Sequence, residues 1–351
     1  MVNKSPRELV QLPSSWSIPH IMEALEAALV GSGPALAFGP TQFDRVSDEI
    51  AVVIPTSGSS GTPKEVALSA KALQASANAA HQYLGAHRGQ RWSLQLPINH
   101  IAGVNVLVRA LALGTDLADA DFEYTSIVPT QLFRALQDGT EDLLALQNAR
   151  AVLVGGAASS EKLLSEARSR GVNVVTTYGM SEMSGGCIYN NVPLLNVEVE
   201  IRSVQRIALR GPMQASQYLG LESNLADSDG WFLTSDAGYL ENGKLFVIGR
   251  VDDQIISGGE KISLSTIDDY LNTHISLLFM SCAIESQEWG QQLCLASNSN
   301  FDENQISHLL REAFGAHAVP KLFLMNIELP ETSIGKADRA TLSKRFEMIR
   351  P

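Results

Sequence analysis

The sequence predicts an α/β protein with a large N-terminal domain and a smaller α+β domain after it. Three patterns support this class: a strand–helix–strand unit over residues 151–176, short alternating strands from about 193 to 250, and mixed patterns after 251. The chain has 351 residues, enough for two domains. We expect parallel strands and a small β-rich subdomain in residues 1–250, and a mobile domain in residues 251–351.

Composition and charge exclude several function classes. With 26 basic and 38 acidic residues the net charge is −12, which argues against nucleic-acid partners and anionic membranes. The most apolar stretch, residues 101–118, contains Asn105, Arg109 and Asp116, and it is too short and polar to span a bilayer. The first residues lack the apolar segment of a signal peptide, and three cysteines make no disulfide framework. We therefore expect a cytoplasmic protein without membrane insertion.

The first third of the chain predicts two helices and one buried strand. A helix is expected over residues 18–29, and the apolar run Ile50–Ile54 predicts a strand. That strand leads into residues 55–64, which are rich in hydroxyls and glycine. The alanine-rich residues 70–84 predict a helix that ends at Gly85.

Residues 151–176 predict a β-α-β unit. The run 151–154 is a strand, and Ser159 or Ser160 caps a helix that continues to about Ser169. The second strand is expected over residues 172–176. Strands joined in this way are parallel, with a right-handed crossover.

The segments that follow the two strands should meet at one edge of the sheet. These segments are Gly155–Ser159 and Tyr178–Glu182. Both would emerge at the carboxyl ends of parallel strands, where open α/β sheets bind ligands. The sequence therefore places a candidate site there.

Four short strands between residues 193 and 250 predict the β-rich subdomain. They alternate with turn residues and are expected over residues 197–201, 207–210, 231–233 and 245–248.

The hydroxyl- and glycine-rich segment has the chemistry of a phosphate-binding loop. Glycines let the backbone approach an anion, and hydroxyls and N–H groups can surround phosphate oxygens. Lys64 adds a positive charge. The spacing of Gly58, Gly61 and Lys64 does not fit the P-loop of nucleotide triphosphatases. An exposed flexible loop would have the same composition.

Further candidate binding residues lie at or near other predicted strand ends and turns. Glu182 offers a carboxylate of the kind Mg²⁺ takes together with substrate phosphates, and Tyr178 could stack on a base. Asp236 could accept two ribose hydroxyls, with Arg250 following 14 residues later. Lys336 lies in a glycine-containing loop that could reach another domain. Taken singly, residues of these kinds are more often ordinary turn or surface residues, and a buried core tyrosine is at least as common as one that stacks on a base.

In their order along the chain these segments resemble the adenylate-forming superfamily, which includes acyl-CoA synthetases, adenylation domains of peptide synthetases and luciferases. The resemblance covers residues 55–339 and depends on five motifs in family order. The matching segments are Thr56–Lys64, Tyr178–Glu182, Thr234–Asp236, Gly249–Gly259 and Pro330–Arg339. The resemblance implies the fold of that superfamily, shortened at its N-terminus.

A narrower resemblance points to one group within the superfamily. Residues 96–103, 128–132, 178–187 and 257–262 look like the 2-succinylbenzoate–CoA ligases of menaquinone biosynthesis. This resemblance implies a ligase that adenylates an aromatic dicarboxylate and transfers the acyl group to CoA, with ATP, Mg²⁺ and CoA as cofactors. A ligase for another aryl or acyl acid is the alternative, and a non-catalytic ATP- or AMP-binding regulator is a third hypothesis.

The resemblance also implies roles for individual residues. Lys336 would bridge the attacking carboxylate and the α-phosphate, Glu182 would hold Mg²⁺, and Asp252 would be the hinge of the C-terminal domain. Nucleotide binding falls to the remaining motif residues. Those implied for the β- and γ-phosphates are Thr56, Ser57, Gly58, Ser59, Ser60, Gly61, Thr62 and Lys64. Those implied for adenine, α-phosphate and ribose are Gly155, Gly156, Ala157, Tyr178, Gly179, Ser181, Asp236 and Arg250.

Two residues are candidates for the acid substrate. His100 matches a family position at the acyl pocket, near the entry of CoA, and is a catalytic as well as a substrate-binding candidate; a structural histidine is the alternative. Arg109 falls in the apolar, helix-like stretch 104–113, where an unpaired charge is costly. A dicarboxylate needs a cation for its non-reacting carboxylate, and arginine suits it through bidentate geometry. An internal salt bridge of Arg109 is the alternative.

The chain departs from the family pattern in two respects. About 55 residues precede the phosphate loop, far fewer than in larger relatives, so we expect a reduced N-terminal subdomain in which part of the usual scaffold is either missing or replaced by the contacts of a homodimer. Ser235 stands where the family usually has glycine, and Ser60 replaces the common threonine. Neither serine removes a proposed ligand group.

Overall fold

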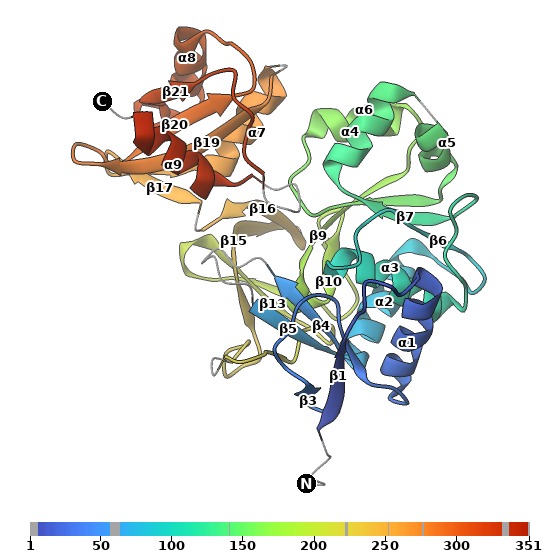
Figure 1. Cartoon of the computed structure of the whole chain (residues 1–351). Coiled ribbons are helices and arrows are strands. Elements are labelled where there is room, and N and C mark those ends of the chain that lie inside the picture. Colours follow the sequence, from blue (N-terminus) through green and yellow to red (C-terminus); the bar gives the residue numbers. More distant parts are fainter. Residues whose placement is uncertain are drawn as a thin grey trace.

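The computed structural model describes residues 6–56, 64–139, 141–221, 224–251, 253–275, 277–331 and 337–349. Within these ranges the strands form four sheets, three built from residues 7–250 and the fourth from residues 254–324 (Figure 1).

The first sheet has the order β14-β5-β4-β2-β1-β3. Its strands are β1 (Arg7–Gln11), β2 (Ala35–Ala37), β3 (Arg45–Val46), β4 (Ile50–Thr56), β5 (Lys64–Ser69) and β14 (Gln217–Tyr218). The strand expected over residues 50–54 is confirmed, and it continues to Thr56 because it pairs antiparallel with β5. Thr56 lies opposite Lys64 in this pairing. The candidate loop residues 57–63 lie outside the described residues.

The second sheet has the order β11-β10-β9-β8-β7-β6. Its strands are β6 (Trp92–Leu94), β7 (Tyr124–Ile127), β8 (Ala151–Val154), β9 (Val174–Met180), β10 (Gly185–Tyr189) and β11 (Val192–Pro193). The β-α-β prediction is confirmed: β8 and β9 pair in parallel, with α6 (Glu161–Ser169) between them. Ser160 is the cap, since its side chain accepts a hydrogen bond from the Leu163 amide at 3.2 Å.

The predicted bounds of the second strand of this unit were wrong. Residues 172–176 were expected, whereas β9 begins at Val174 and continues to Met180. The extension follows from a tertiary pairing, because β9 also pairs antiparallel with β10. Tyr178 and Gly179 therefore lie within the strand, and only Ser181–Met183, a 3₁₀ turn (η1), follows it.

Helices α1 (Ile18–Val30), α2 (Ala70–Leu84) and α3 (Ile101–Leu113) lie between the first two sheets (Figure 1). They share one core with inward-facing residues of both sheets. Strand side chains alternate between faces, so Leu153 of β8 joins this core. Val152 and Val154 point to the opposite face, which is covered by α4 (Pro129–Asp138), α5 (Glu141–Asn148) and α6.

The β-rich prediction is confirmed by the third sheet, ordered β12-β13-β15-β16. Its strands are β12 (Glu198–Ile201), β13 (Arg206–Arg210), β15 (Phe232–Glu241) and β16 (Lys244–Arg250). The strand expected over residues 231–233 is much longer than predicted, since β15 pairs with both β13 and β16.

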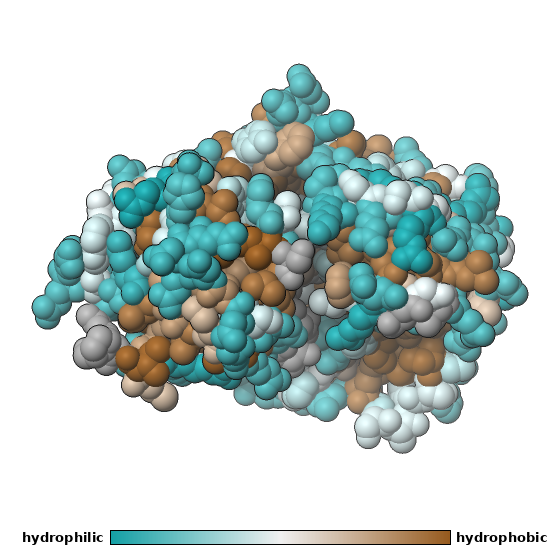
Figure 2. Space-filling model, turned by 90° about the horizontal axis from the view of Figure 1, so that it is seen from above, coloured by the Kyte–Doolittle hydropathy of each residue, from teal (hydrophilic) through white to brown (hydrophobic). Residues whose placement is uncertain are grey.

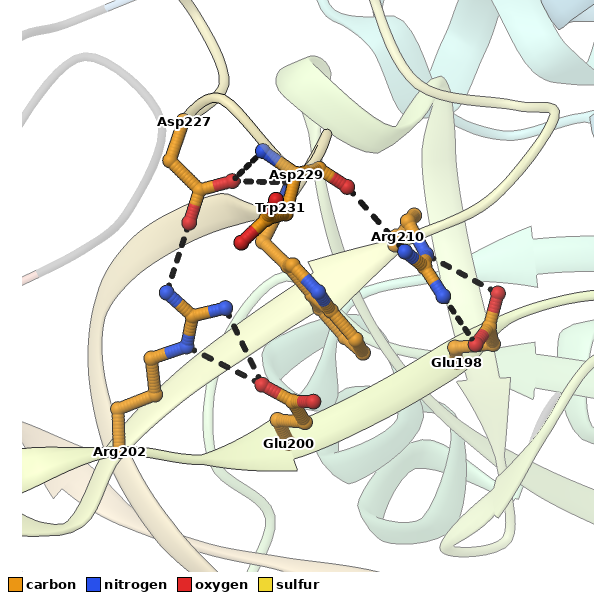
Figure 3. Close-up of polar contacts among 7 residues, drawn as sticks. All are labelled: Glu198, Glu200, Arg202, Arg210, Asp227, Asp229 and Trp231. Atoms are coloured by element: carbon orange, nitrogen blue, oxygen red, sulfur yellow. Dashed lines mark hydrogen bonds and ion pairs between the residues drawn. The ribbon is translucent and has the colours of Figure 1, made fainter.

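The outer face of this sheet carries paired charges around a tryptophan (Figure 3). The guanidinium carbons of Arg202 and Arg210 lie 5.6 and 4.6 Å from the ring centre of Trp231. Arg202 pairs with Asp227 at 2.7 Å, and Arg210 pairs with Glu198 at 2.6 Å.

The fourth sheet is antiparallel except for its last strand. It contains β17 (Gln254–Ser257), β18 (Glu260–Ser263), β19 (Phe279–Ser286), β20 (Gly290–Ser297) and β21 (Leu322–Leu324), which pairs parallel with β20. Helices α7 (Leu264–His274) and α8 (Glu303–Phe314) share a core with one face, and α9 (Arg339–Ile349) packs on the other. The division of the chain into domains at residues 250 and 251 stays a prediction.

Seen from above, the molecule is mostly hydrophilic and is hollowed between the side that bears α7–α9 and the side that bears α4–α6 (Figure 2). Among the described residues, every helix is too short or too polar to cross a bilayer. Cys187, Cys282 and Cys294 are buried free thiols.

Candidate active site

The β9–β10 hairpin contributes to three side-chain clusters. We call them the Asp236 cluster (Tyr178, Asp236, Arg250), the Glu182 cluster (Glu182, Tyr218, Lys64) and the Arg109 cluster (Arg109, Tyr189, Ser126, Trp92). Tyr178 belongs to β9, Glu182 to the turn η1, and Tyr189 to β10. The hairpin thus connects groups that are far apart in the sequence.

The Asp236 cluster joins the second and third sheets. The Tyr178 hydroxyl donates to Asp236 Oδ2 at 2.6 Å, and Arg250 Nη1 lies 4.0 Å from Asp236 Oδ1. Asp236 and Arg250 are paired across β15 and β16. Burial, together with the Asp236 carboxylate, raises the pKa of Tyr178 well above its usual value. Tyr178 therefore remains a hydrogen-bond donor.

The Glu182 cluster connects η1 to strands β5 and β14 of the first sheet. The Tyr218 hydroxyl donates to Glu182 Oε1 at 2.8 Å, and the Lys64 ammonium lies 5.0 Å from the Tyr218 ring centre. Burial and the nearby Glu182 charge raise the pKa of Tyr218. Sequence reasoning missed Tyr218, because its place depends on a two-residue strand that pairs with β5.

Two candidate glycines lie where a larger residue would not fit. A Cβ on Gly155 would come within 2.1 Å of Thr177 Oγ1, and one on Gly179 would come within 1.9 Å of the Gly185 carbonyl oxygen. Because glycine has no Cβ, β8, β9 and β10 can approach one another this closely at the carboxyl edge of the parallel strands.

The Arg109 cluster is buried between α3 and the second sheet. Arg109 is 3% exposed. Its Nη2 donates to the Tyr189 hydroxyl at 2.9 Å, its Nη1 lies 3.5 Å from Ser126 Oγ, and its guanidinium carbon lies 5.1 Å from the Trp92 ring centre. Among the described residues, no carboxylate pairs with Arg109, and its Nε has no partner. The internal salt bridge offered as the alternative is therefore not found in the described part of the chain.

His81 of α2 adds no charge to this region. It is 7% exposed, its ring centre lies 6.1 Å from that of Trp92, and its Nε2 has no partner. Burial, followed by the Arg109 charge, lowers the pKa of His81 to about 4. The indole nitrogen of Trp92 is likewise buried without a hydrogen-bond partner. Arg109 is therefore a cation among neutral groups, and two of these groups, His81 and Trp92, have a buried nitrogen that lacks a hydrogen bond.

The other predicted residues are placed as follows. His100 precedes α3 as its half-buried N-cap residue. Gly156 and Ala157 lie in the turn after β8, and Ser181 lies in η1. Ser57, Gly58, Ser59, Ser60, Gly61, Thr62, Asp252 and Lys336 lie outside the described residues.

Glu182 has the chemistry expected of a Mg²⁺ ligand. No group of three or more histidine, cysteine or acidic side chains that could hold a metal occurs in the described ranges. A single carboxylate fits Mg²⁺, which retains waters and takes its other oxygens from phosphates.

A hollow of about 650 Å³ on the third sheet contains none of the predicted residues. It is lined by Glu198, Val199, Glu200, Arg210, Asp229 and Trp231. Glu198 and Glu200 already pair with Arg210 and Arg202, as Figure 3 shows, whereas Arg109 has no carboxylate partner among the described residues.

Comparison with known proteins identifies the family and the relatives of this chain. Residues 19–210 match the family described as AMP-binding enzyme. The chain is 35% identical to a probable 2-succinylbenzoate–CoA ligase of Mycobacterium tuberculosis, over 96% of this chain and 98% of that one. It is 28% identical to the 2-succinylbenzoate–CoA ligase of Lactococcus lactis, over 85% of this chain and 72% of that protein.

Solved structures show the same fold. One is the o-succinylbenzoate CoA synthetase of Bacillus subtilis in complex with the acyl-adenylate intermediate OSB-AMP, with a TM-score of 0.75 and 23% identity over 95% of this chain and 82% of that chain. Another is ATP-bound MatB of Rhodopseudomonas palustris, with a TM-score of 0.78 and 20% identity over 89% of this chain and 71% of that one.

The fold and these relatives together define an adenylate-forming enzyme. The chain belongs to the AMP-binding enzyme family, and within it to the group of the 2-succinylbenzoate–CoA ligases.

Proposed function

We propose that this enzyme adenylates 2-succinylbenzoate with ATP and transfers the acyl group to CoA, as a step of menaquinone biosynthesis. The names of the relatives support the substrate. The structural observation that carries the proposal is Arg109, a buried cation without a carboxylate partner in the described part of the chain.

Arg109 suits an acid with two carboxylates. A buried charge is tolerated where a counter-charge and hydrogen bonds compensate it. One carboxylate of 2-succinylbenzoate would supply the counter-charge, while the other reacts with ATP. An acid with a single carboxylate would leave the Arg109 charge without a counter-ion.

The first half-reaction joins two anions. The substrate carboxylate attacks the α-phosphate of ATP, and pyrophosphate leaves with the bonding electrons, giving the acyl-adenylate. Two unit charges about 4 Å apart interact by roughly 4 kcal/mol at an effective dielectric of ~20, so cations at this point strongly affect the barrier. Lys336 would bridge carboxylate and α-phosphate, with Ser181 beside it.

The nucleotide would be held by the residues of the family motifs. Asp236 and Arg250 would bind the ribose hydroxyls, and Gly155, Gly156, Ala157, Tyr178 and Gly179 would frame the adenine side of the nucleotide. Thr56–Lys64 would surround the β- and γ-phosphates. Glu182 would hold Mg²⁺, which when bound neutralises phosphate charge.

The second half-reaction requires the C-terminal domain to turn. The CoA thiol attacks the acyl carbonyl, and AMP leaves. Asp252 would be the hinge of the rotation that removes Lys336, and residues 257–262 would line the channel for CoA. His100 would stand at the acyl pocket where CoA enters.

The test is acid-dependent AMP formation with 2-succinylbenzoate, ATP and CoA. Stoichiometric AMP and acyl-CoA are expected. A pyrophosphate-exchange screen over aryl and acyl acids, run with and without CoA, covers the other outcomes. Exchange with a different acid only would make the chain a ligase for that acid, and absence of exchange with every acid would favour a non-catalytic nucleotide binder.

Two further features belong to this proposal. The enzyme would act in the cytoplasm, and it would form a homodimer. Size-exclusion chromatography with light scattering tests the second feature, since a mass near 37.9 kDa would mean a monomer.

A further inference from the structure

We propose that Tyr189 is a second recognition residue for the non-reacting carboxylate of the substrate, acting together with Arg109. Its hydroxyl accepts a hydrogen bond from Arg109 and would itself donate a hydrogen bond to that carboxylate. This inference rests on the proposed function, because it assumes an acid substrate with a carboxylate that remains unreacted.

The Tyr189 hydroxyl is a hydrogen-bond donor that has no acceptor among the described residues. Tyr189 is fully buried in β10, and its hydroxyl oxygen accepts from Arg109 Nη2 at 2.9 Å. In the described part of the chain, no group accepts the hydroxyl hydrogen of Tyr189. A buried hydroxyl normally uses its donor as well as its acceptor.

The hydroxyl is held in its protonated form and in one place. Burial raises the pKa of Tyr189, although the Arg109 charge opposes that shift. The ring packs edge-on against Tyr83, with 5.3 Å between the ring centres. Its orientation is therefore fixed by packing, and the hydroxyl points at the guanidinium.

The surroundings favour an anion over a neutral group. Arg109 Nε and Trp92 Nε1 are further buried nitrogens without partners in the same cluster. A carboxylate has two oxygens with about four acceptor positions, enough to take bonds from Arg109 and Tyr189 at once. Neutral His81 contributes no competing charge.

Tyr189→Phe tests the role of the hydroxyl. A hydrogen bond to a charged group is worth enough to change affinity by about 10- to 100-fold, so the KM for 2-succinylbenzoate should rise by that factor. The KM for ATP and the kcat should change by less than about twofold, since the hydroxyl touches neither the nucleotide nor the reacting carboxylate. An analogue that lacks the non-reacting carboxylate should be used equally by both proteins.

Tyr83→Phe is the matched control. Tyr83 is the neighbouring ring, and its hydroxyl accepts from Asn190 Nδ2 at 3.2 Å instead of contacting Arg109. Its loss should leave the KM for the acid unchanged. Tyr189 would be only structural if the KM for the acid rose equally in Tyr83→Phe and Tyr189→Phe. The same would follow if Tyr189→Phe raised the KM for the analogue as much as the KM for 2-succinylbenzoate.

A second measurement needs no variant. In a structure of the wild-type protein with the acid bound, the Tyr189 hydroxyl oxygen should lie about 2.5–3.0 Å from a carboxylate oxygen. A separation beyond ~3.5 Å overturns the inference. If the wild-type protein makes no AMP from 2-succinylbenzoate, the proposed function is refuted. If the wild-type protein is active and Tyr189→Phe leaves the KM for 2-succinylbenzoate unchanged, this inference alone is refuted.

Discussion

The Tyr178 hydroxyl donates to Asp236 across 2.6 Å, although 58 positions separate the two residues in the chain. This bond joins β9 of the second sheet to β15 of the third. It brings two segments that resemble separate family motifs into contact.

We expect Asp236→Ala to raise the KM for ATP by about 10- to 100-fold, because it removes charged acceptors for the ribose hydroxyls. The KM for the acid should change little. Steady-state kinetics and calorimetric titration with ATP measure both effects. Asp229→Ala on the outer face of the third sheet is the control, and an equal loss there would contradict the assignment.

Arg109→Met should raise the KM for the acid by about 10²-fold without lowering the unfolding temperature of the free protein. The variant removes a buried charge and leaves no carboxylate of the described residues unpaired, so folding loses little. Kinetics and thermal unfolding are the measurements.

Arg202→Met is the matched control for Arg109→Met. Arg202 also lies over a tryptophan ring, but it pairs with Asp227 and Glu200. Its loss should leave the KM for the acid unchanged. A fall of several degrees in the unfolding temperature of Arg109→Met would favour the alternative that Arg109 forms an internal salt bridge.

Tyr218→Phe should weaken metal binding in the presence of ATP by about tenfold, since partners that orient a metal ligand typically have effects of 10- to 100-fold. The hydroxyl that fixes Glu182 is lost, while the ring beside Lys64 remains. Titration with Mn²⁺ followed by electron paramagnetic resonance measures binding directly. Equal affinity in both proteins would show that Tyr218 does not position Glu182.

His81 should make the protein less stable as the pH falls. Its folded pKa of about 4 lies below the unfolded value of 6.5, so the unfolded chain binds the proton first. The contribution of neutral His81 is complete above about pH 6.5 and is lost between there and about pH 4. Between pH 7 and 5 the loss amounts to about 2 kcal/mol of unfolding free energy.

Denaturant unfolding at pH 7 and pH 5 tests this dependence. His81→Gln should show a smaller difference between the two pH values than the wild-type protein. His20→Gln, at an exposed position, should retain the full difference. Identical differences in all three proteins would mean that His81 does not contribute.

Lys336→Ala should lower adenylation by roughly 10²- to 10⁴-fold, the range for loss of one important electrostatic group. The transfer of a supplied acyl-adenylate to CoA should be spared, because Lys336 would have left the site by then. Pyrophosphate exchange and acyl-CoA formation follow the two half-reactions. Equal loss in both would argue against rotation of the C-terminal domain.

The sequence by itself predicted the class of the fold, a minority of its helices and strands, among them α1, α2, α6, β4 and β8, and, through the family resemblance, the candidate nucleotide residues. It could do so because periodicity, capping residues and glycine turns act locally, as at Ser160, whose side chain caps α6. It also singled out Arg109, since a charge within an apolar helix is recognisable without knowing its neighbours.

Only the tertiary structure decided what these residues meet. The length of β9 depends on its pairing with β10, and Tyr218 reaches Glu182 because a two-residue strand pairs with β5. Tyr189 lies 80 positions from Arg109 and has no local signature. Contacts between distant segments are fixed by sheet order and core packing, which no local pattern encodes, and the proposed recognition of the acid's carboxylate depends on such contacts.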